Sequence, residues 1–93
     1  MDGRRLAEIR GLLRLSQERM ARLLGVSFAS VNRWEGGHSA PIGTTMDVYR
    51  ALDAALKNGY DPGRVVAGYD NNRGEFLRQL FVMAYGRGKR GGT

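Results

Sequence analysis

An amide, a guanidinium and two apolar side chains occur close together between residues 28 and 35. Asn32 and Arg33 follow Phe28 and Ala29 at the spacing of one helical turn. An Asn amide pairs with the edge of adenine, an Arg guanidinium pairs with guanine, and an apolar side chain contacts the methyl group of thymine. The stretch holds no acid before Glu35. If this stretch is helical, it is suited to enter the major groove of DNA.

Catalytic and metal-binding chemistry has few candidate residues in this chain. There is no cysteine, which excludes disulfides, thiol catalysis and cysteine-based metal sites, and His38 is the one histidine. The carboxylates fall on separate predicted elements, and no nucleophile has a histidine partner with a third orienting group. We therefore expect no enzyme activity, no metal and no cofactor.

The charge of the chain points to a polyanionic partner. Fifteen Lys and Arg against nine Asp and Glu give a net charge of +6 in 93 residues. The excess lies at both ends, since residues 1–35 and 73–93 are basic and residues 36–72 are slightly acidic. A small basic domain of this kind is a candidate nucleic-acid binder. With no long apolar run and no secretory segment at the start, we expect a cytoplasmic protein and no membrane contact.

The candidate base-reading stretch needs helices to position it, and the apolar spacing predicts an all-α chain. Asp2 is a candidate cap for a first helix with Leu6, Ile9 and Leu13 on one face. Ser16 and Ser27 are candidate N-caps for two short helices, and Gly25 ends the first of them. Within the third helix, Val31 and Trp34 are expected to face the core.

Three more helices are predicted after the glycine pair at 36 and 37. One begins at Thr44, where Thr44-x-x-Asp47 resembles a capping box, and ends at Gly59. Asp61-Pro62 starts a short helix, and Glu75 to Tyr85 forms the last one. We divide the chain into a DNA-binding domain at 1–70, a terminal helix at 71–85 and a flexible basic tail at 86–93.

The turn Leu24-Gly25-Val26-Ser27 joins two helices of about eight residues, which is the sequence form of a helix-turn-helix. Here residues 9–41, "IRGLLRLSQERMARLLGVSFASVNRWEGGHSAP", resemble the Cro/C1-type, xenobiotic-response-element-like regulators. The segment "SVNRWEGGHSAP" also resembles the DNA-binding half of MqsA-type antitoxins, whose separate zinc domain this cysteine-free chain lacks. The resemblance implies a compact repressor-like bundle of five helices, to which the terminal helix is added.

The resemblance also implies roles for individual residues. Gln17, together with the first amides of its helix, would bind a DNA phosphate. Phe28, Ala29, Asn32 and Arg33 would occupy the base-reading positions. Residues implied to lie near the DNA backbone are Ser27 and Ser30. The positions of Arg10 and Glu35 imply an ion pair between the first and third helices.

One loop departs from the family pattern. Family members commonly carry Lys or Arg between the third helix and the proline, whereas residues 36–40 here are Gly-Gly-His-Ser-Ala. His38 is expected beside a phosphate. Thr44 and Thr45, or the backbone of the glycine pair at 36 and 37, are candidates to replace the missing cation.

The C-terminal segment predicts two further contacts. In the tail, Arg87, Lys89 and Arg90 would follow phosphates without reading bases. The last helix is apolar nearly all round, which predicts burial on more than one side. We expect Phe76, Leu77, Leu80, Phe81 and Ala84 to complete the core. A homodimer interface is expected to contain Leu80, Val82, Met83 and Tyr85.

These observations favour a small sequence-specific regulator of double-stranded DNA, of the repressor type, that binds a palindromic operator as a homodimer. Two alternatives stay open. One is an antitoxin that binds a toxin protein and autoregulates its operon. The other is an RNA-binding or nucleoid-type protein, which would show little preference among duplex sequences.

Overall fold

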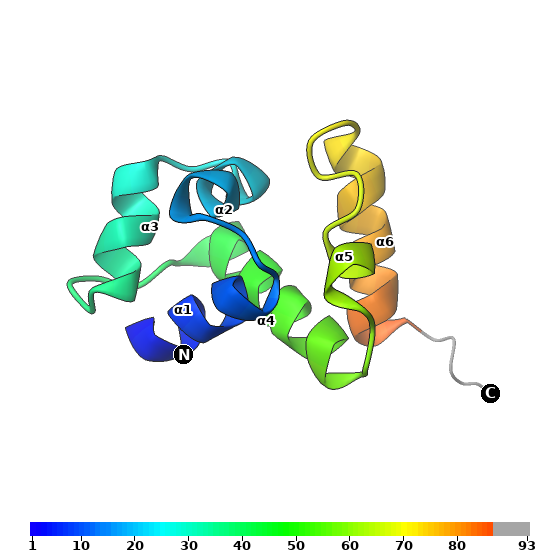
Figure 1. Cartoon of the computed structure of the whole chain (residues 1–93), viewed down its shortest axis with the longest axis horizontal. Helices are drawn as coiled ribbons and strands as arrows, with labels where there is room; N and C mark the ends of the chain where they lie inside the picture. The colour runs from blue at the N-terminus through cyan, green and yellow to red at the C-terminus, as the bar shows by residue number, and fades with distance from the viewer. Residues whose placement is uncertain (87–93) are drawn as a thin grey trace. The chain divides into compact units, whose positions relative to one another are not determined.

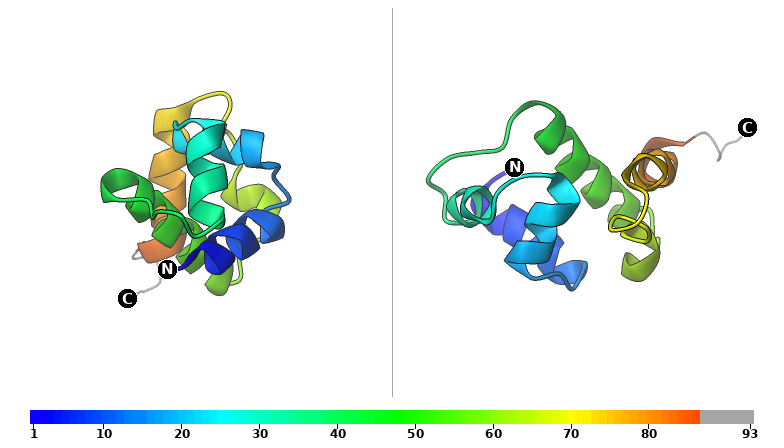
Figure 2. Two further views of the ribbon diagram at one scale, coloured as in Figure 1. Left: turned by 90° about the vertical axis from the view of Figure 1, so that its left-hand side faces the viewer. Right: turned by 90° about the horizontal axis from the view of Figure 1, so that it is seen from above.

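A computed structural model describes residues 1–86 of the chain. Within these residues there are six helices and no strand, so the all-α prediction is confirmed. Figures 1 and 2 show the course of the chain. The helices are α1 (Gly3–Leu12), α2 (Gln17–Leu24), α3 (Phe28–Glu35), α4 (Gly43–Lys57), α5 (Pro62–Val65) and α6 (Arg73–Tyr85). Among the described helices, none could span a membrane.

The predicted N-caps hold the helix starts. Asp2 accepts a hydrogen bond from the Arg5 amide at 2.9 Å, and Ser16 accepts one from the Arg19 amide at 3.1 Å. Ser27 does the same for the amide of Ser30 at 3.1 Å. Each cap satisfies a backbone donor that has no partner within the helix. These short polar side chains therefore set where α1, α2 and α3 begin.

Two helix starts differ from the predictions. Helix α4 begins at Gly43, so Thr44 lies inside the first turn and does not cap it. Helix α6 begins at Arg73 because the Asn72 side chain accepts a hydrogen bond from the Glu75 amide at 3.0 Å. The predicted start at Glu75 is therefore two residues late. The predicted cap of α5 is correct, since Asp61 accepts bonds from the amides of residues 63 and 64.

The described chain divides into two compact units, and the first is Met1–Tyr49. In this unit α3 packs against both α1 and α2, and its outer side faces the viewer in the left panel of Figure 2. Trp34 is half-buried, and its ring meets that of Tyr49 edge to face with centroids 6.4 Å apart. The largest buried side chains of this unit are Leu6, Ile9, Met20, Leu23, Val31 and Tyr49.

The second unit begins at Arg50, within α4. Asn58, just after α4, donates hydrogen bonds to the carbonyl oxygens of Met83 and Ala84, at 3.0 and 3.1 Å. The bonds tie the last turn of α6 to the end of α4. The buried apolar side chains of this unit include Leu52, Val65, Phe76 and Leu80. The predicted domain division at residue 70 stays a prediction.

Candidate nucleic-acid interface

The four predicted base-reading side chains share the exposed side of α3. Phe28 is half exposed, at 50%, although it is a large apolar side chain, and Ala29, Asn32 and Arg33 are also exposed. Val31, on the opposite side of the same helix, is fully buried. Burial of one face therefore fixes which face of α3 is presented to solvent.

Arg10 on α1 and Glu35 at the end of α3 form a two-bonded ion pair. The Arg10 Nε donates to Glu35 Oε2 at 2.7 Å, and the Arg10 Nη2 donates to Glu35 Oε1 at 2.9 Å. The Glu35 side chain is only 6% exposed. Bidentate geometry makes this a stronger contact than a typical surface ion pair.

The end of α1 supplies a further acceptor for this pair. Leu15 donates its amide to the carbonyl of Arg10, and Arg14 donates to Gly11, which together form a Schellman motif. Arg14 occupies the left-handed position of this motif, with φ of 60°. The turn brings the Leu15 carbonyl back over α1, where it accepts a bond from Arg10 Nη1 at 3.0 Å.

The pair shifts the pKa of both partners. Burial of Glu35 opposes its charged form. The hydrogen bonds from Arg10 and Gln17 and the charge of Arg10 outweigh that cost, so the pKa of Glu35 lies below its usual value. The hydrogen bond to Glu35 raises the pKa of Arg10. Both groups are therefore held in their charged forms.

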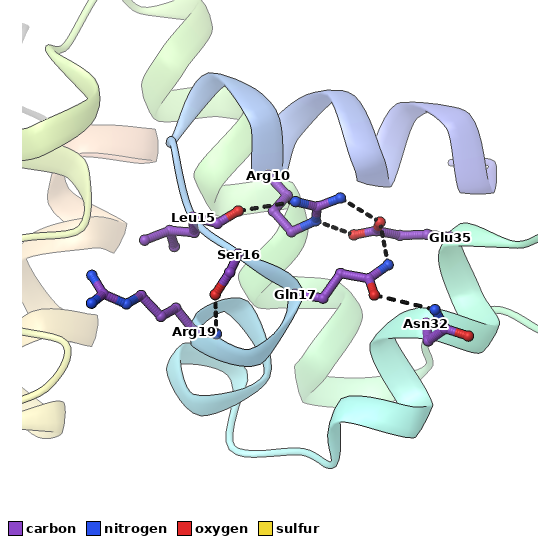
Figure 3. A network of polar contacts seen from close by, with 7 residues as sticks. All are labelled: Arg10, Leu15, Ser16, Gln17, Arg19, Asn32 and Glu35. Atoms are coloured by element: carbon purple, nitrogen blue, oxygen red, sulfur yellow. Dashed lines mark hydrogen bonds and ion pairs between the residues drawn. The ribbon is translucent and has the colours of Figure 1, made fainter.

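Gln17, the first residue of α2, joins this pair to the exposed side of α3 (Figure 3). Its Nε2 donates to Glu35 Oε1 at 2.9 Å, and its Oε1 accepts from the Asn32 Nδ2 at 3.1 Å. A continuous polar network thus runs from α1 through α3 and α2 to a predicted base-reading side chain.

One family comparison decides the nature of this domain. The family model described as the helix-turn-helix domain matches residues 3–58, more than half of the chain. The chain belongs to the helix-turn-helix domain family. No curated protein and no solved structure matched the chain. Membership of the helix-turn-helix family supports DNA binding by a small regulator.

The residues predicted to contact phosphate differ in their exposure and in their bonds. The hydroxyl oxygens of Ser27, the N-cap of α3, and Ser30 lie 2.9 Å apart, so these two side chains bond to each other. His38 and Thr44 are exposed, and Thr45 is half-buried. Their contacts with phosphate, like that of Gln17, stay predictions. The three tail cations, Arg87, Lys89 and Arg90, lie outside the described residues.

Sequence reasoning missed a close approach that supports the helix-turn-helix. A Cβ atom at Gly3 would lie 2.6 Å from the Trp34 carbonyl oxygen and 2.7 Å from that of Glu35. Such distances are too short for a real contact, so only glycine allows α1 to approach the end of α3. Nothing in the local sequence distinguishes Gly3 from Gly11, which has open space around it.

The terminal helix corrects part of the predicted dimer interface. Leu80 and Met83 are buried within the chain, at 0% and 6% exposure, so their predicted place in an interface is wrong. Phe81, predicted for the core, is instead exposed at 36%, and Leu77 is half-buried. The buried stripe of α6 passes through Phe76, Leu80, Met83 and Ala84.

The other side of α6 carries an open apolar surface. Val82 and Tyr85 are 51% and 60% exposed, as predicted for residues that do not serve the core. The rings of Phe81 and Tyr85 lie 5.9 Å apart on this surface. We call it the α6 patch, and its lining residues are Leu77, Arg78, Phe81, Val82, Tyr85 and Gly86.

Within residues 1–86, no three His, Asp or Glu side chains gather in a way that could hold an ion.

Proposed function

We propose that this protein is a sequence-specific transcriptional regulator of the repressor type, similar to the Cro/C1 regulators, which inserts α3 into the major groove of double-stranded DNA. The observation that carries the proposal is the exposed row of Phe28, Ala29, Asn32 and Arg33 on a helix whose opposite side is buried. The major groove, about 12 Å wide, admits one α-helix and presents a distinct pattern of donors and acceptors for each base pair.

Helix α2 would fix the position of α3 on the DNA. Its first amides point out of the helix start, which favours a phosphate there. Gln17 retains one Nε2 hydrogen beyond the bond it gives to Glu35, so it can donate to the same phosphate. A phosphate contact of this kind sets the register of the protein without reading sequence.

The proposal is tested by selecting bound duplexes from a random pool with the full chain. A regulator of this type enriches one defined sequence over competing duplexes. Enrichment of no sequence, with equal binding to all duplexes and a steep salt dependence, would instead indicate the RNA-binding or nucleoid-type alternative.

We further propose that a second copy of the chain covers the α6 patch. Leu77, Phe81 and Tyr85 follow one another at four-residue intervals, so they form a continuous strip along one side of the helix. A strip on a single helix can pair with its own copy about a two-fold axis, the commonest symmetry of soluble oligomers. Two recognition helices related by such an axis would read a palindromic operator.

The antitoxin alternative uses the same patch for a different occupant. An exposed apolar surface of this kind suits a heterologous protein as well as a second copy. Co-purification of one stoichiometric toxin, with the chain alone remaining monomeric, would favour that alternative over the homodimer.

A further inference from the structure

The polar network that ends at Asn32 has a single allowed direction (Figure 3). The Arg10 guanidinium holds only donors, and the ionised Glu35 carboxylate holds only acceptors. Gln17 must therefore turn its Nε2 toward Glu35, at 2.9 Å, which leaves its Oε1 for Asn32. That oxygen can only accept, so Asn32 must present Nδ2 to it, at 3.1 Å.

Reversal of the Gln17 amide would break the network at two points, and reversal of the Asn32 amide would break it at one. A reversed Gln17 would bring its carbonyl oxygen against Glu35 Oε1 and its NH2 group against the NH2 group of Asn32. Both contacts pair like with like, and the first one faces a carboxylate that is almost completely buried. Buried polar groups without partners are costly. The charge of Arg10 therefore fixes, through Glu35, the orientation of the Gln17 amide.

The Asn32 amide keeps two groups for a ligand. Its Oδ1 and its second Nδ2 hydrogen are not bonded within the described residues, and the side chain is exposed. Adenine offers a matching acceptor and donor, N7 and the N6 amino group, side by side in the major groove. Guanine offers two acceptors there, and one of them would face Oδ1.

We propose that Gln17 is a positioning residue for base recognition, which holds the Asn32 amide in the one orientation that reads adenine. This inference rests on the proposed DNA-binding function. Without Gln17 the amide can turn over and present its donor and acceptor in exchanged places. The major-groove pattern of T·A is the mirror of that of A·T. An amide that has turned over therefore matches T·A in place of A·T. Gln17 would thereby control specificity at one base position.

The test compares Gln17→Met with wild type in the full chain. Methionine keeps the length of the side chain and removes both of its hydrogen-bonding groups. Asn32→Ala first identifies the base position that Asn32 reads, where discrimination should fall by about 5- to 150-fold. Gln17→Met should lower discrimination at that same position by about three- to ten-fold and leave the other positions unchanged. The control is Glu18→Gln, an exposed neighbour outside the network, which should leave the base preferences as they are.

A second readout needs no DNA. The side-chain amide protons of Asn32, observed by nuclear magnetic resonance in the free protein, should report one hydrogen-bonded and one solvent-exposed proton. In Gln17→Met the signals of both protons should move to the positions of an exposed amide. The backbone signals of the buried residues of α2 and α3 should stay in place. Unchanged Asn32 amide signals would overturn the relay whether or not the protein binds DNA.

The outcomes separate the inference from the function on which it rests. If wild type enriches no sequence, the proposed function fails, while the amide signals still decide whether the relay exists. If wild type is specific and Gln17→Met weakens binding to all sequences equally, Gln17 is a phosphate contact alone and the inference is wrong. Loss of preference confined to the Asn32 position supports it.

Discussion

The Arg10 guanidinium bonds both carboxylate oxygens of Glu35, at 2.7 and 2.9 Å, across the interface between α1 and α3. The Glu35 side chain has little access to water, and Arg10 is partly exposed. The pair thus anchors the recognition helix from the side that faces away from DNA in our proposal.

Removing one partner of this pair should lower the free energy of unfolding by more than the pair itself contributes, because the other charge is left unpaired. Arg10→Met leaves a buried carboxylate without its cation, and we expect a loss of about 2–4 kcal/mol in the free energy of unfolding. Combining Arg10→Met with Glu35→Gln should cost less than the sum of the single changes, as measured by urea unfolding. Strict additivity in this double-mutant cycle would show that the two side chains do not stabilise each other.

The same pair predicts a pH dependence of stability. The pKa of Glu35 is lowered by folding, so its contribution is complete above its ordinary value of 4.5 and is lost as the pH falls through the lower folded-state value. The free energy of unfolding should decrease through this acid range in wild type and decrease less in Glu35→Gln. The control is Glu75→Gln, since Glu75 pairs with Arg78 on the exposed surface and such pairs contribute little. An equal slope in wild type and Glu35→Gln would be inconsistent with the role given to Glu35.

Two alanine substitutions in α1 should have opposite effects. Gly3→Ala places a methyl group against the backbone oxygens of Trp34 and Glu35, which cannot move aside as a side chain would. We expect a loss of about 1–3 kcal/mol in the free energy of unfolding. Gly11→Ala meets nothing within 4 Å and should be neutral or stabilising by up to about 1 kcal/mol, because alanine favours the helix. Thermal unfolding of both variants tests the close approach of α1 to α3, which equal effects would disprove.

The sequence predicted helix starts well where a short polar side chain precedes an apolar pattern, as at Asp2, Ser16 and Ser27. The start of α6 was harder to predict because Asp70, Asn71 and Asn72 are all suitable caps, and only the folded chain shows that Asn72 is the one used. The starts at Asp2, Ser16 and Ser27 could be predicted from local sequence because capping is a contact between residues three apart.

Tertiary contacts explain what the sequence could not predict. The sequence of a helix that is apolar on all sides does not show which side faces the core. The burial of Leu80 and Met83 and the exposure of Phe81 therefore depend on what packs against α6. The bond from Asn32 to Gln17 joins residues fifteen apart in sequence and has no local pattern. The predicted exposed row on α3 has such a pattern, because Val31 fixes the buried side.

The α6 patch should hold the dimer together. Val82→Glu puts a charge on the α6 patch and should convert the protein to a monomer at micromolar concentration without unfolding it. Sedimentation measures the mass, and circular dichroism measures the helix content. The control is Asn71→Glu, which adds the same charge at an exposed position before α6. A wild-type chain that sediments as a monomer at this concentration would refute the homodimer.

Base reading by α3 is tested by the affinity of wild type, Asn32→Ala and Arg33→Ala for the selected duplex and for a scrambled one, measured at one salt concentration. Each variant should keep the wild-type unfolding temperature, because both side chains are exposed. Each should lose about 1–3 kcal/mol of discrimination between the two duplexes, while binding to the scrambled duplex changes little. If both variants distinguish the two duplexes as well as wild type does, α3 is not the recognition helix.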